Sequence, residues 1–462
     1  MNGRLGMMFR RAWLPGWLAL ASVALIACSG DDDGGGGGEG GGNGIAAVSG
    51  DAAVFDNTEL VGDAGVLLDG AAPAPVSRLP GGDTVAFDAC MIVEVRKVDL
   101  LFVVDDSASM GEEQEALRRE FPALIRALTS GDRDGDGTVD FPPVQDLHLG
   151  VVSTDMGLQG IDGILGCGGL GKDGVLQSAG DTELAGCEES YPSFLSYDAE
   201  TDSPTQVASD FGCIASLGTE GCGFEQPLEA ALKALTPSDS STGFVSSAGF
   251  PDADRGHGDT DNDGFLRPND PEGPSVLGVV VVTDEEDCSW SDPRHLTPPD
   301  FLPPDSELAM QDLNLRCFYN PDNLFPVDRY VDGLRKLREG NEELLVFGVI
   351  AGVPPDLVDA EARAGVDFAD GAAREEYYDG ILGDDRMQET VDATLEAPFG
   401  NLEPSCVTDN GRAYPPRRLV QVARGFGEGG IVQSICQDDF GPAMDVLVGS
   451  LAARVEDLCM IE

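Results

Sequence analysis

A short apolar run that ends in acidic and hydroxyl side chains is the feature that most restricts the fold of this chain. The run Leu100–Val104 is rich in Val and shows no polar alternation, which indicates a strand buried on both faces. Residues 112–128, which follow, carry apolar side chains at helical spacing. The polar side chains between these two segments include Asp105, Ser107 and Ser109. They are therefore expected on a strand-to-helix turn, where open α/β sheets bind their ligands.

Several further apolar runs alternate with segments of helical periodicity. The predicted strands cover residues 146–155, 276–283, 344–350 and 430–435. The run Val276–Thr283 is the most strand-like and is predicted to be central, whereas residues 430–435 are predicted to form an edge strand. This alternation predicts an α/β fold with a doubly wound, mostly parallel, Rossmann-like sheet flanked by helices.

Two long segments interrupt this pattern. Residues 156–224 are rich in Gly, contain four Cys and lack a long apolar period, so they are predicted to be an irregular insertion held by disulfides. Residues 238–274 are predicted to form a second long loop.

The N-terminal residues have the pattern of an export signal followed by a linker. Arginines precede the apolar segment Ala12–Ile26, which is too short for a comfortable membrane span, so residues 1–27 are predicted to be a signal peptide. The sequence Leu25-Ile26-Ala27-Cys28-Ser29 resembles the bacterial lipobox, which implies cleavage before Cys28 and a lipid on its sulfur. A secretory signal with an incidental cysteine is the alternative. The serine after Cys28 favours the outer membrane, by analogy with enteric bacteria. Residues 28–89 predict a disordered tether, and the folded domain is expected to cover residues 90–462.

The charge balance limits the classes of partner. Asp and Glu total 83 against 28 Lys and Arg, which gives a formal net charge of -55. Such a chain repels nucleic acid and anionic lipid headgroups, so no nucleic acid is expected and membrane contact is expected through the lipid anchor only. The charge attracts divalent cations and basic surfaces. A solubility adaptation, for example to high salt, is the alternative origin of the bulk charge.

A second acidic strand end follows the predicted central strand, in the sequence Val282-Thr283-Asp284. Mg²⁺ prefers octahedral oxygen coordination and keeps several waters. The pattern Asp-x-Ser-x-Ser after a buried strand, with an Asp closing a second strand, resembles the metal-ion-dependent adhesion site of von Willebrand factor type A domains. The resemblance covers about residues 92–460, with the two insertions. It implies a Mg²⁺ or Mn²⁺ ion held by Asp105, Ser107, Ser109 and Asp284.

One ligand of that site has no clear counterpart in this chain. The family's middle motif is a Thr in a loop before a helix that reads Ala-Leu, and here Ala231-Leu232 is preceded by Thr219 and Glu225. Glu225 is a candidate for the ligand position, Thr219 lies early for it, and Thr154 at the end of the second strand is a third candidate. A Glu in the open coordination position would weaken the binding of a partner's carboxylate. The alternative interpretation of the serine-rich turn is a helix N-cap with capping serines.

Two acidic loops have the spacing of calcium-binding loops. The first has Asp at loop positions one, three, five and nine, namely Asp132, Asp134, Asp136 and Asp140, but Pro143 at position twelve. The second has Asp at positions one, three, five and twelve, namely Asp259, Asp261, Asp263 and Asp270. Ca²⁺ is predicted in both loops, and solvated acidic turns are the alternative.

Ten cysteines remain if Cys28 is lipidated, and an even number in an exported chain predicts disulfides. Because the termini of a type A fold lie close together, Cys90 is predicted to pair with Cys459. Two further predicted pairs are Cys288–Cys317, after the central strand, and Cys406–Cys436, around the edge strand. Three pairings stay open for the remaining four cysteines, Cys167, Cys187, Cys213 and Cys222. The chain has no Cys-x-x-Cys pair and three His, so a zinc site is not expected.

The sequence gives little support for an enzyme. The segment Gly166–Lys172 resembles a phosphate-binding loop, but Asp173 stands where Ser or Thr is required, so no nucleotide is expected. There is no Gly-x-Ser-x-Gly motif, and no specific pair of carboxylates indicates glycoside hydrolysis.

Binding is the predicted function. Anchored in the bacterial cell envelope, the chain would use its metal ion to bind an acidic side chain of a protein in the envelope or on another cell. The alternative is a calcium-stabilised structural protein of the envelope without a regulated ligand, and a hydrolase is a third possibility.

Overall fold

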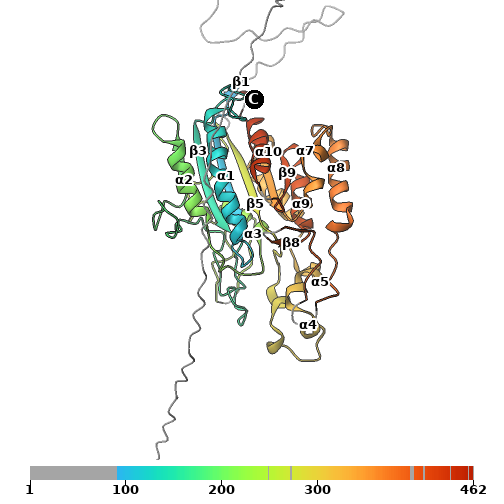
Figure 1. Cartoon of the computed structure of the whole chain (residues 1–462). Coiled ribbons are helices and arrows are strands. Elements are labelled where there is room, and N and C mark those ends of the chain that lie inside the picture. The colour runs from blue at the N-terminus through green and yellow to red at the C-terminus, as the bar shows by residue number, and fades with distance from the viewer. Residues whose placement is uncertain are drawn as a thin grey trace, which may run out of the picture. The chain divides into compact units, whose positions relative to one another are not determined.

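The main feature of the fold is a six-stranded sheet with the strand order β4-β3-β2-β5-β6-β9 (Figure 1). The computed structural model describes residues 91–247, 249–270, 273–395, 400–408, 411–437, 439–455 and 457–460. The strands are β2 (Lys97–Val104), β3 (Asp146–Ser153), β4 (Leu195–Asp198), β5 (Ser275–Val282), β6 (Leu345–Ala351) and β9 (Gly430–Ser434). Five of them run parallel, and β4 at one edge is antiparallel to β3. The predicted α/β fold with a mostly parallel sheet is confirmed, with β5 inside the sheet and β9 at its edge.

Two short antiparallel ribbons accompany the sheet. β1 (Met91–Glu94) pairs with β10 (Asp457–Met460), and β7 (Cys406–Val407) pairs with β8 (Arg412–Ala413). The first ribbon joins the beginning of the described chain to its end, because Ile92 lies opposite Cys459. The predicted disulfide between Cys90 and Cys459 and the lipidation of Cys28 lie outside the described residues and side chains.

Helices pack on both faces of the sheet (Figure 1). The longer ones are α1 (Gly111–Ser130), α2 (Pro204–Ala215), α3 (Pro227–Leu235), α6 (Asp328–Lys336), α8 (Gly371–Gly383), α9 (Arg417–Gly425) and α10 (Gly441–Ala452). The shorter ones are α4 (Glu307–Met310), α5 (Arg316–Tyr319) and α7 (Ala360–Arg363). Side chains of α1, α2 and α10 form one core with the sheet, and those of α3, α6, α8 and α9 form the other. In the described part of the chain, no helix is long and apolar enough to cross a membrane.

Strand β2 shows why the apolar run has no polar alternation. Leu100, Phe102 and Val104 contribute to one core, and Leu101 and Val103 contribute to the other. All five side chains are fully buried. Because successive side chains of a strand point to opposite faces, a strand covered on both sides must be apolar at every position.

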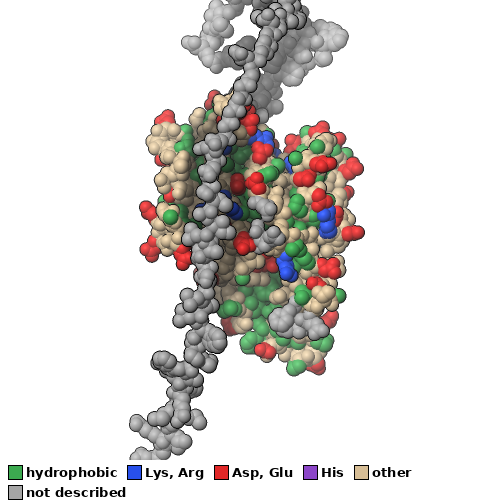
Figure 2. All heavy atoms as spheres, viewed as in Figure 1, with side chains coloured by type: hydrophobic (Ala, Val, Ile, Leu, Met, Phe, Trp, Pro, Cys, Tyr) green, Lys and Arg blue, Asp and Glu red, His purple; other side chains and the backbone are tan. Residues whose placement is uncertain are grey.

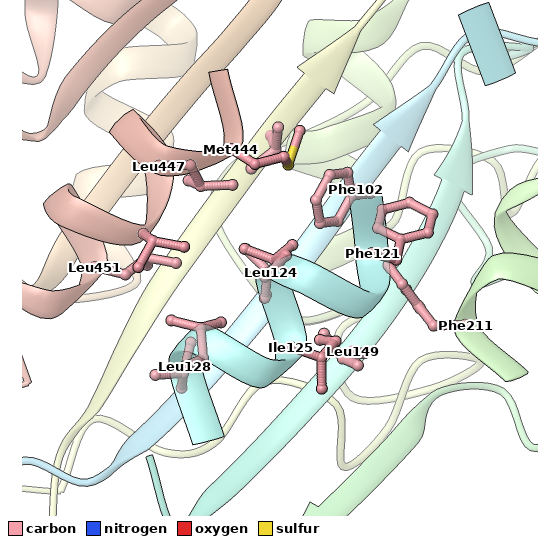
Figure 3. Packing of buried hydrophobic residues seen from close by; sticks show 14 of the residues in the cluster. Phe102, Phe121, Leu124, Ile125, Leu128, Leu149, Phe211, Met444, Leu447 and Leu451 are labelled. Atoms are coloured by element: carbon pink, nitrogen blue, oxygen red, sulfur yellow. The ribbon is translucent and has the colours of Figure 1, made fainter. Parts of the chain in front are cut away.

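The first core is organised around three aromatic rings from β2, α1 and α2. The ring centroids of Phe102 and Phe121 lie 5.4 Å apart, and those of Phe121 and Phe211 lie 4.6 Å apart, in edge-to-face arrangements (Figure 3). Leu124 and Leu447 pack beside them. This packing fixes α1 against β2, and thereby fixes the turn between them that carries Ser107 and Ser109.

Four disulfides lie within the described part of the chain. The predicted pairs Cys288–Cys317 and Cys406–Cys436 are confirmed. The pairing that the sequence left open is resolved as Cys167–Cys222 and Cys187–Cys213. Cys187–Cys213 ties the connection between β3 and β4 to α2, and Cys167–Cys222 joins the same connection to the loop before α3.

The prediction of an irregular segment over residues 156–224 is wrong for residues 195–215. These residues form the edge strand β4 and helix α2 of the main fold. Leu195 and Tyr197 are buried while their neighbours are exposed, but an alternation of four residues is too short to stand out in the sequence. Helix α2 owes its place to Phe211, whose burial becomes evident only when α1 lies beside it.

Candidate metal centre at the carboxyl edge of the sheet

The carboxyl ends of β2 and β5 lie side by side where the strand order changes direction. Counted within the sheet, the order is 3-2-1-4-5-6, so the chain leaves β2 toward β3 and later returns on the other side as β5. Open α/β sheets bind ligands in the crevice at such a switch point. Asp105 directly follows β2, and its N–H donates to the carbonyl of Val282 at the end of β5, at 3.0 Å. Asp284 follows two residues later, so the two predicted acidic ligands belong to adjacent strand ends.

One hydrogen-bonded set connects four of the predicted ligands. The N–H of Ser107 donates to Oδ1 of Asp105 at 2.8 Å, and the hydroxyls of Ser107 and Ser109 lie 3.2 Å apart. The hydroxyl of Ser109 donates to Oδ1 of Asp284 at 3.2 Å. Thr283 donates its hydroxyl to Oδ2 of Asp105 at 2.5 Å, which fixes the carboxylate from the other side. The structure therefore brings together Asp105, Ser107, Ser109 and Asp284.

The alternative role of the serines, as caps of α1, is wrong. The N-cap residue of α1 is Met110, and no side chain caps this helix. The hydroxyls of Ser107 and Ser109 point instead to each other and toward Asp284. Ser109 is exposed while Asp105 and Asp284 are buried, so the set is reached from solvent on the Ser109 side.

The carboxylates of this edge lie in surroundings that disfavour their charge. Burial raises the pKa of Asp105 to about 6. Burial and, next, the charge of Asp105 raise the pKa of Asp284 to about 7. The pKa values of Glu225 and Glu285 are also raised well above their usual range, first by burial and then by the neighbouring acids. The main influences on the pKa values of Asp105 and Asp284 include no basic side chain, so a bound cation is the natural counter-charge for these two carboxylates.

Three residues remain candidates for the third metal ligand, namely Thr154, Thr219 and Glu225. Glu225 is buried two residues before α3, and the charges of Asp105 and Asp284 are among the causes of its raised pKa. Thr154 is fully buried and its hydroxyl has no hydrogen-bond partner. Thr219 lies beside the start of α1, since a methyl group added to Gly111 would contact its Cγ2 at 3.6 Å. Each of the three therefore lies on an element that packs at this edge.

The structure adds residues that the sequence analysis did not select. The side-chain amide of Gln114 donates to the carbonyls of Asp105 at 2.7 Å and Gly218 at 2.9 Å. It thereby ties the loop before α3 to the turn that carries Ser107 and Ser109. The carboxylate of Asp106 accepts from the hydroxyl of Ser153 at 2.7 Å. A signal for Gln114 exists, because it is a polar residue on the buried stripe of α1, three residues before Leu117.

The first acidic loop gathers its carboxylates. It follows the left-handed cap of α1 at Gly131. Asp132 accepts hydrogen bonds from the N–H groups of Gly135 at 2.7 Å and Gly137 at 2.9 Å. One oxygen from each of Asp132, Asp134 and Asp136 lies within 4.8 Å of the others, and Asp140 accepts from the N–H of Arg133 at 2.9 Å. The geometry suits a cation with oxygen ligands.

The second acidic loop directs its carboxylates elsewhere. Asp259 accepts from the N–H of Ser238 at 2.5 Å, and Asp261 lies 2.8 Å from Nδ1 of His257. In the described residues, no three carboxylate oxygens of this loop, including those of Asp263 and Asp270, lie within 4.8 Å of one another. The structure therefore does not bring these four predicted ligands together.

A further group of metal-ligand types is used for another purpose. Cys288, His295 and Cys317 offer ligand atoms within 4.8 Å of one another. The two cysteines form a disulfide, so their sulfurs are not thiolates.

Comparisons of the chain with protein-family models, with curated proteins and with solved structures found no match. The site is therefore argued from the geometry of the chain's own residues. That geometry is a hydrogen-bonded set of two carboxylates and two hydroxyls, buried at the switch point of the sheet and open to solvent at Ser109.

Proposed function

We propose that this chain is a metal-dependent protein-binding module, similar to von Willebrand factor type A domains, that binds an acidic side chain of its partner. The observation that carries the proposal is the set Asp105, Ser107, Ser109 and Asp284 at the carboxyl ends of β2 and β5. The strand order, with helix-covered faces and a reversal between β2 and β5, supports the doubly wound arrangement that the resemblance implies.

The donor set fits a hard divalent cation. Carboxylate and hydroxyl oxygens from two loops are the ligands that Mg²⁺ prefers, and Mg²⁺ keeps waters in its remaining positions. Asp105, Ser107, Ser109 and Asp284 would hold the ion, and the exposed side at Ser109 leaves a position for a partner's carboxylate. A direct bond to the ion explains how a chain of net charge -55 selects an acidic side chain.

The N-terminal pattern supports display of this module on a bacterial envelope. A lipid on Cys28 would anchor the chain in the outer membrane, and residues 28–89 would act as the tether. A partner in the envelope or on another cell would then meet a domain held away from the bilayer. Membrane contact through the lipid alone agrees with the acidic composition.

A second candidate function is a calcium-stabilised structural protein of the envelope. The convergence of Asp132, Asp134 and Asp136 favours it, because an exposed loop of this kind gains order when a cation binds. The two functions differ in whether a partner binds only when the metal centre is loaded.

Capture of the partner from envelope extracts, with and without Mg²⁺, tests the proposal. The purified domain is expected to retain a partner in Mg²⁺ and to release it in EDTA. Ser107→Ala is expected to abolish capture without changing the circular dichroism spectrum, whereas the matched control Ser196→Ala, at an exposed position of β4, retains it. Capture that persists in EDTA or in Ser107→Ala would overturn the proposal. A calcium-dependent gain in melting temperature that survives Ser107→Ala, without metal-dependent capture, would support the structural role.

A further inference from the structure

A cavity of about 360 Å³ adjoins the candidate metal centre, between the loop that follows β5 and the segment around α5. Its volume falls within the range of small-molecule sites, about 300–1,000 Å³. One part of its lining is acidic and consists of Glu225, Glu285, Glu286, Asp287 and Glu389. Another part is apolar and aromatic, with Phe224, Phe318, Leu324, Leu402 and Tyr414.

Part of the acidic lining has partners already, because Glu286 accepts the backbone N–H of Arg418 at 2.9 Å and Glu389 lies near Arg417 and Arg418. Arg418 is the basic residue of this lining, and it is committed to the carboxylate of Asp287 at 3.0 Å and to the carbonyl of Phe325 at 2.8 Å. In the described part of the chain, the carboxylate of Glu225 accepts a hydrogen bond only from its own backbone N–H, and that of Glu285 accepts none.

These free carboxylates indicate a missing positive partner. Glu225 is only 4 % exposed, so its carboxylate meets little bulk water. Burying an ionised group without a partner is costly, and a ligand that supplies positive charge and donors would remove that cost. The cavity beside Glu225 offers the space for such a ligand.

The shape of the site favours an organic cation over a bare metal ion. In the described part of the chain, no three carboxylate oxygens of this lining lie within 4.8 Å of one another, unlike those of Asp132, Asp134 and Asp136. A Lys or Arg side chain combines an apolar stem with a charged head, which matches a lining that is partly aromatic and partly acidic. Residues 301–319 carry three exposed apolar side chains, Phe301, Met310 and Tyr319. Figure 2 shows hydrophobic side chains at the lower end of the visible face.

We propose that this cavity binds a Lys or Arg side chain of the partner, next to the acidic side chain that binds the metal. The two sites are contiguous, because Asp284 belongs to the metal centre and Glu285 lines the cavity. The partner would therefore present a basic and an acidic side chain close together. The identity of the ligand as a partner side chain rests on the proposed function, whereas the affinity of the cavity for an organic cation does not.

Calorimetric titration of the domain with n-butylguanidinium in EDTA tests the cavity alone. The cation is expected to bind at millimolar concentration, and n-butanol, its neutral counterpart, is not. Glu285→Gln and Glu389→Gln are each expected to weaken binding about tenfold, as for loss of a hydrogen bond to a charged group. Glu376→Gln, which removes the same charge from an exposed position on α8, is the matched control and is expected to bind as the native chain does.

Three results would overturn the inference. They are equal binding of n-butanol, no binding of the cation, or unchanged affinity in both variants. The titrations with n-butylguanidinium contain EDTA and need no metal. A negative result in them therefore does not contradict metal-dependent capture of the partner. Conversely, if no partner is captured in Mg²⁺, the binding of n-butylguanidinium by the cavity is not contradicted.

Discussion

Replacement of Asp284 by Asn is expected to stabilise the metal-free protein and to abolish its stabilisation by Mg²⁺. Asp284 is 3 % exposed and lies near the charge of Asp105, so its ionised form is unfavourable in the absence of a cation. Asn retains the oxygen that accepts the hydrogen bond from Ser109. The substitution therefore removes the charge and keeps the contact.

The magnitude follows from the pKa of Asp284, which is raised from its usual value of 3.8 to about 7 in the folded chain. Between these two values the folded state binds more protons than the unfolded state, so stability falls as the pH rises through this window. At about 1.36 kcal/mol per pKa unit, the full penalty above pH 7 is about 4 kcal/mol. Asp105 shares the same repulsion, so the two penalties do not add. For a domain of about 370 residues, this corresponds to a rise in Tm of about 5 °C at pH 8.

Scanning calorimetry in EDTA at pH 8 and at pH 4 provides the assay. Asp284→Asn is expected to melt higher than the native chain at pH 8 and to differ little from it at pH 4, where the native carboxyl is protonated. Saturation with Mg²⁺ at about 100 times Kd is expected to add about 2.7 kcal/mol to the native chain and nothing to the variant. Asp305→Asn, an exposed control, is expected to show neither effect. A variant that melts lower than the native chain in EDTA at pH 8 would refute the reasoning.

Four further outcomes are expected. Ser109→Ala lowers the Mg²⁺ affinity about tenfold in calorimetric titration, and an unchanged affinity would contradict a role in coordination. The Mg²⁺ affinity of the native chain rises between pH 5 and pH 8, because the carboxyls with pKa values of about 6 and 7 must lose their protons to bind the ion; a pH-independent affinity would contradict this. Asp134→Asn removes the Ca²⁺-dependent protection of residues 132–140 against limited proteolysis, and persistent protection would argue against a calcium site there. Phe102→Ala lowers the free energy of unfolding by about 3–5 kcal/mol in urea titration, and a loss below about 1 kcal/mol would contradict its central place in the core.

The main sheet was predictable because its strands carry strong local signals. The run Leu100–Val104 is apolar at every position, and Ser275–Val282 is buried along its whole length. Such runs are typical of strands covered on both faces, so sequence alone identifies them as interior. Strand β4 was not predictable, because its alternation of buried and exposed side chains covers only the four residues Leu195–Asp198. Its assignment depends on pairing with β3, which no local pattern encodes.

The disulfides show the same division between local and tertiary information. Cys288 and Cys317 flank one loop after β5, so their pairing follows from their position along the chain. The cysteines within residues 156–224 allow several pairings that the sequence does not distinguish. The structure resolves the pairing. Cys213 lies on α2 and pairs with Cys187, whereas Cys222 lies in the loop before α3 and pairs with Cys167.

The sequence by itself identified the candidate metal-binding turn, because Asp105, Ser107 and Ser109 occupy alternate positions directly after a buried strand. It also placed Asp284 at a second strand end. Only the tertiary structure decided that β2 and β5 are neighbours, that Ser109 reaches Asp284 at 3.2 Å, and that Gln114 holds the adjoining loop. The cavity beside Glu285 is likewise a product of the fold, since residues from six separate segments line it. Local patterns specify strands and turns, whereas the approach of distant side chains depends on strand order and on packing across the whole chain.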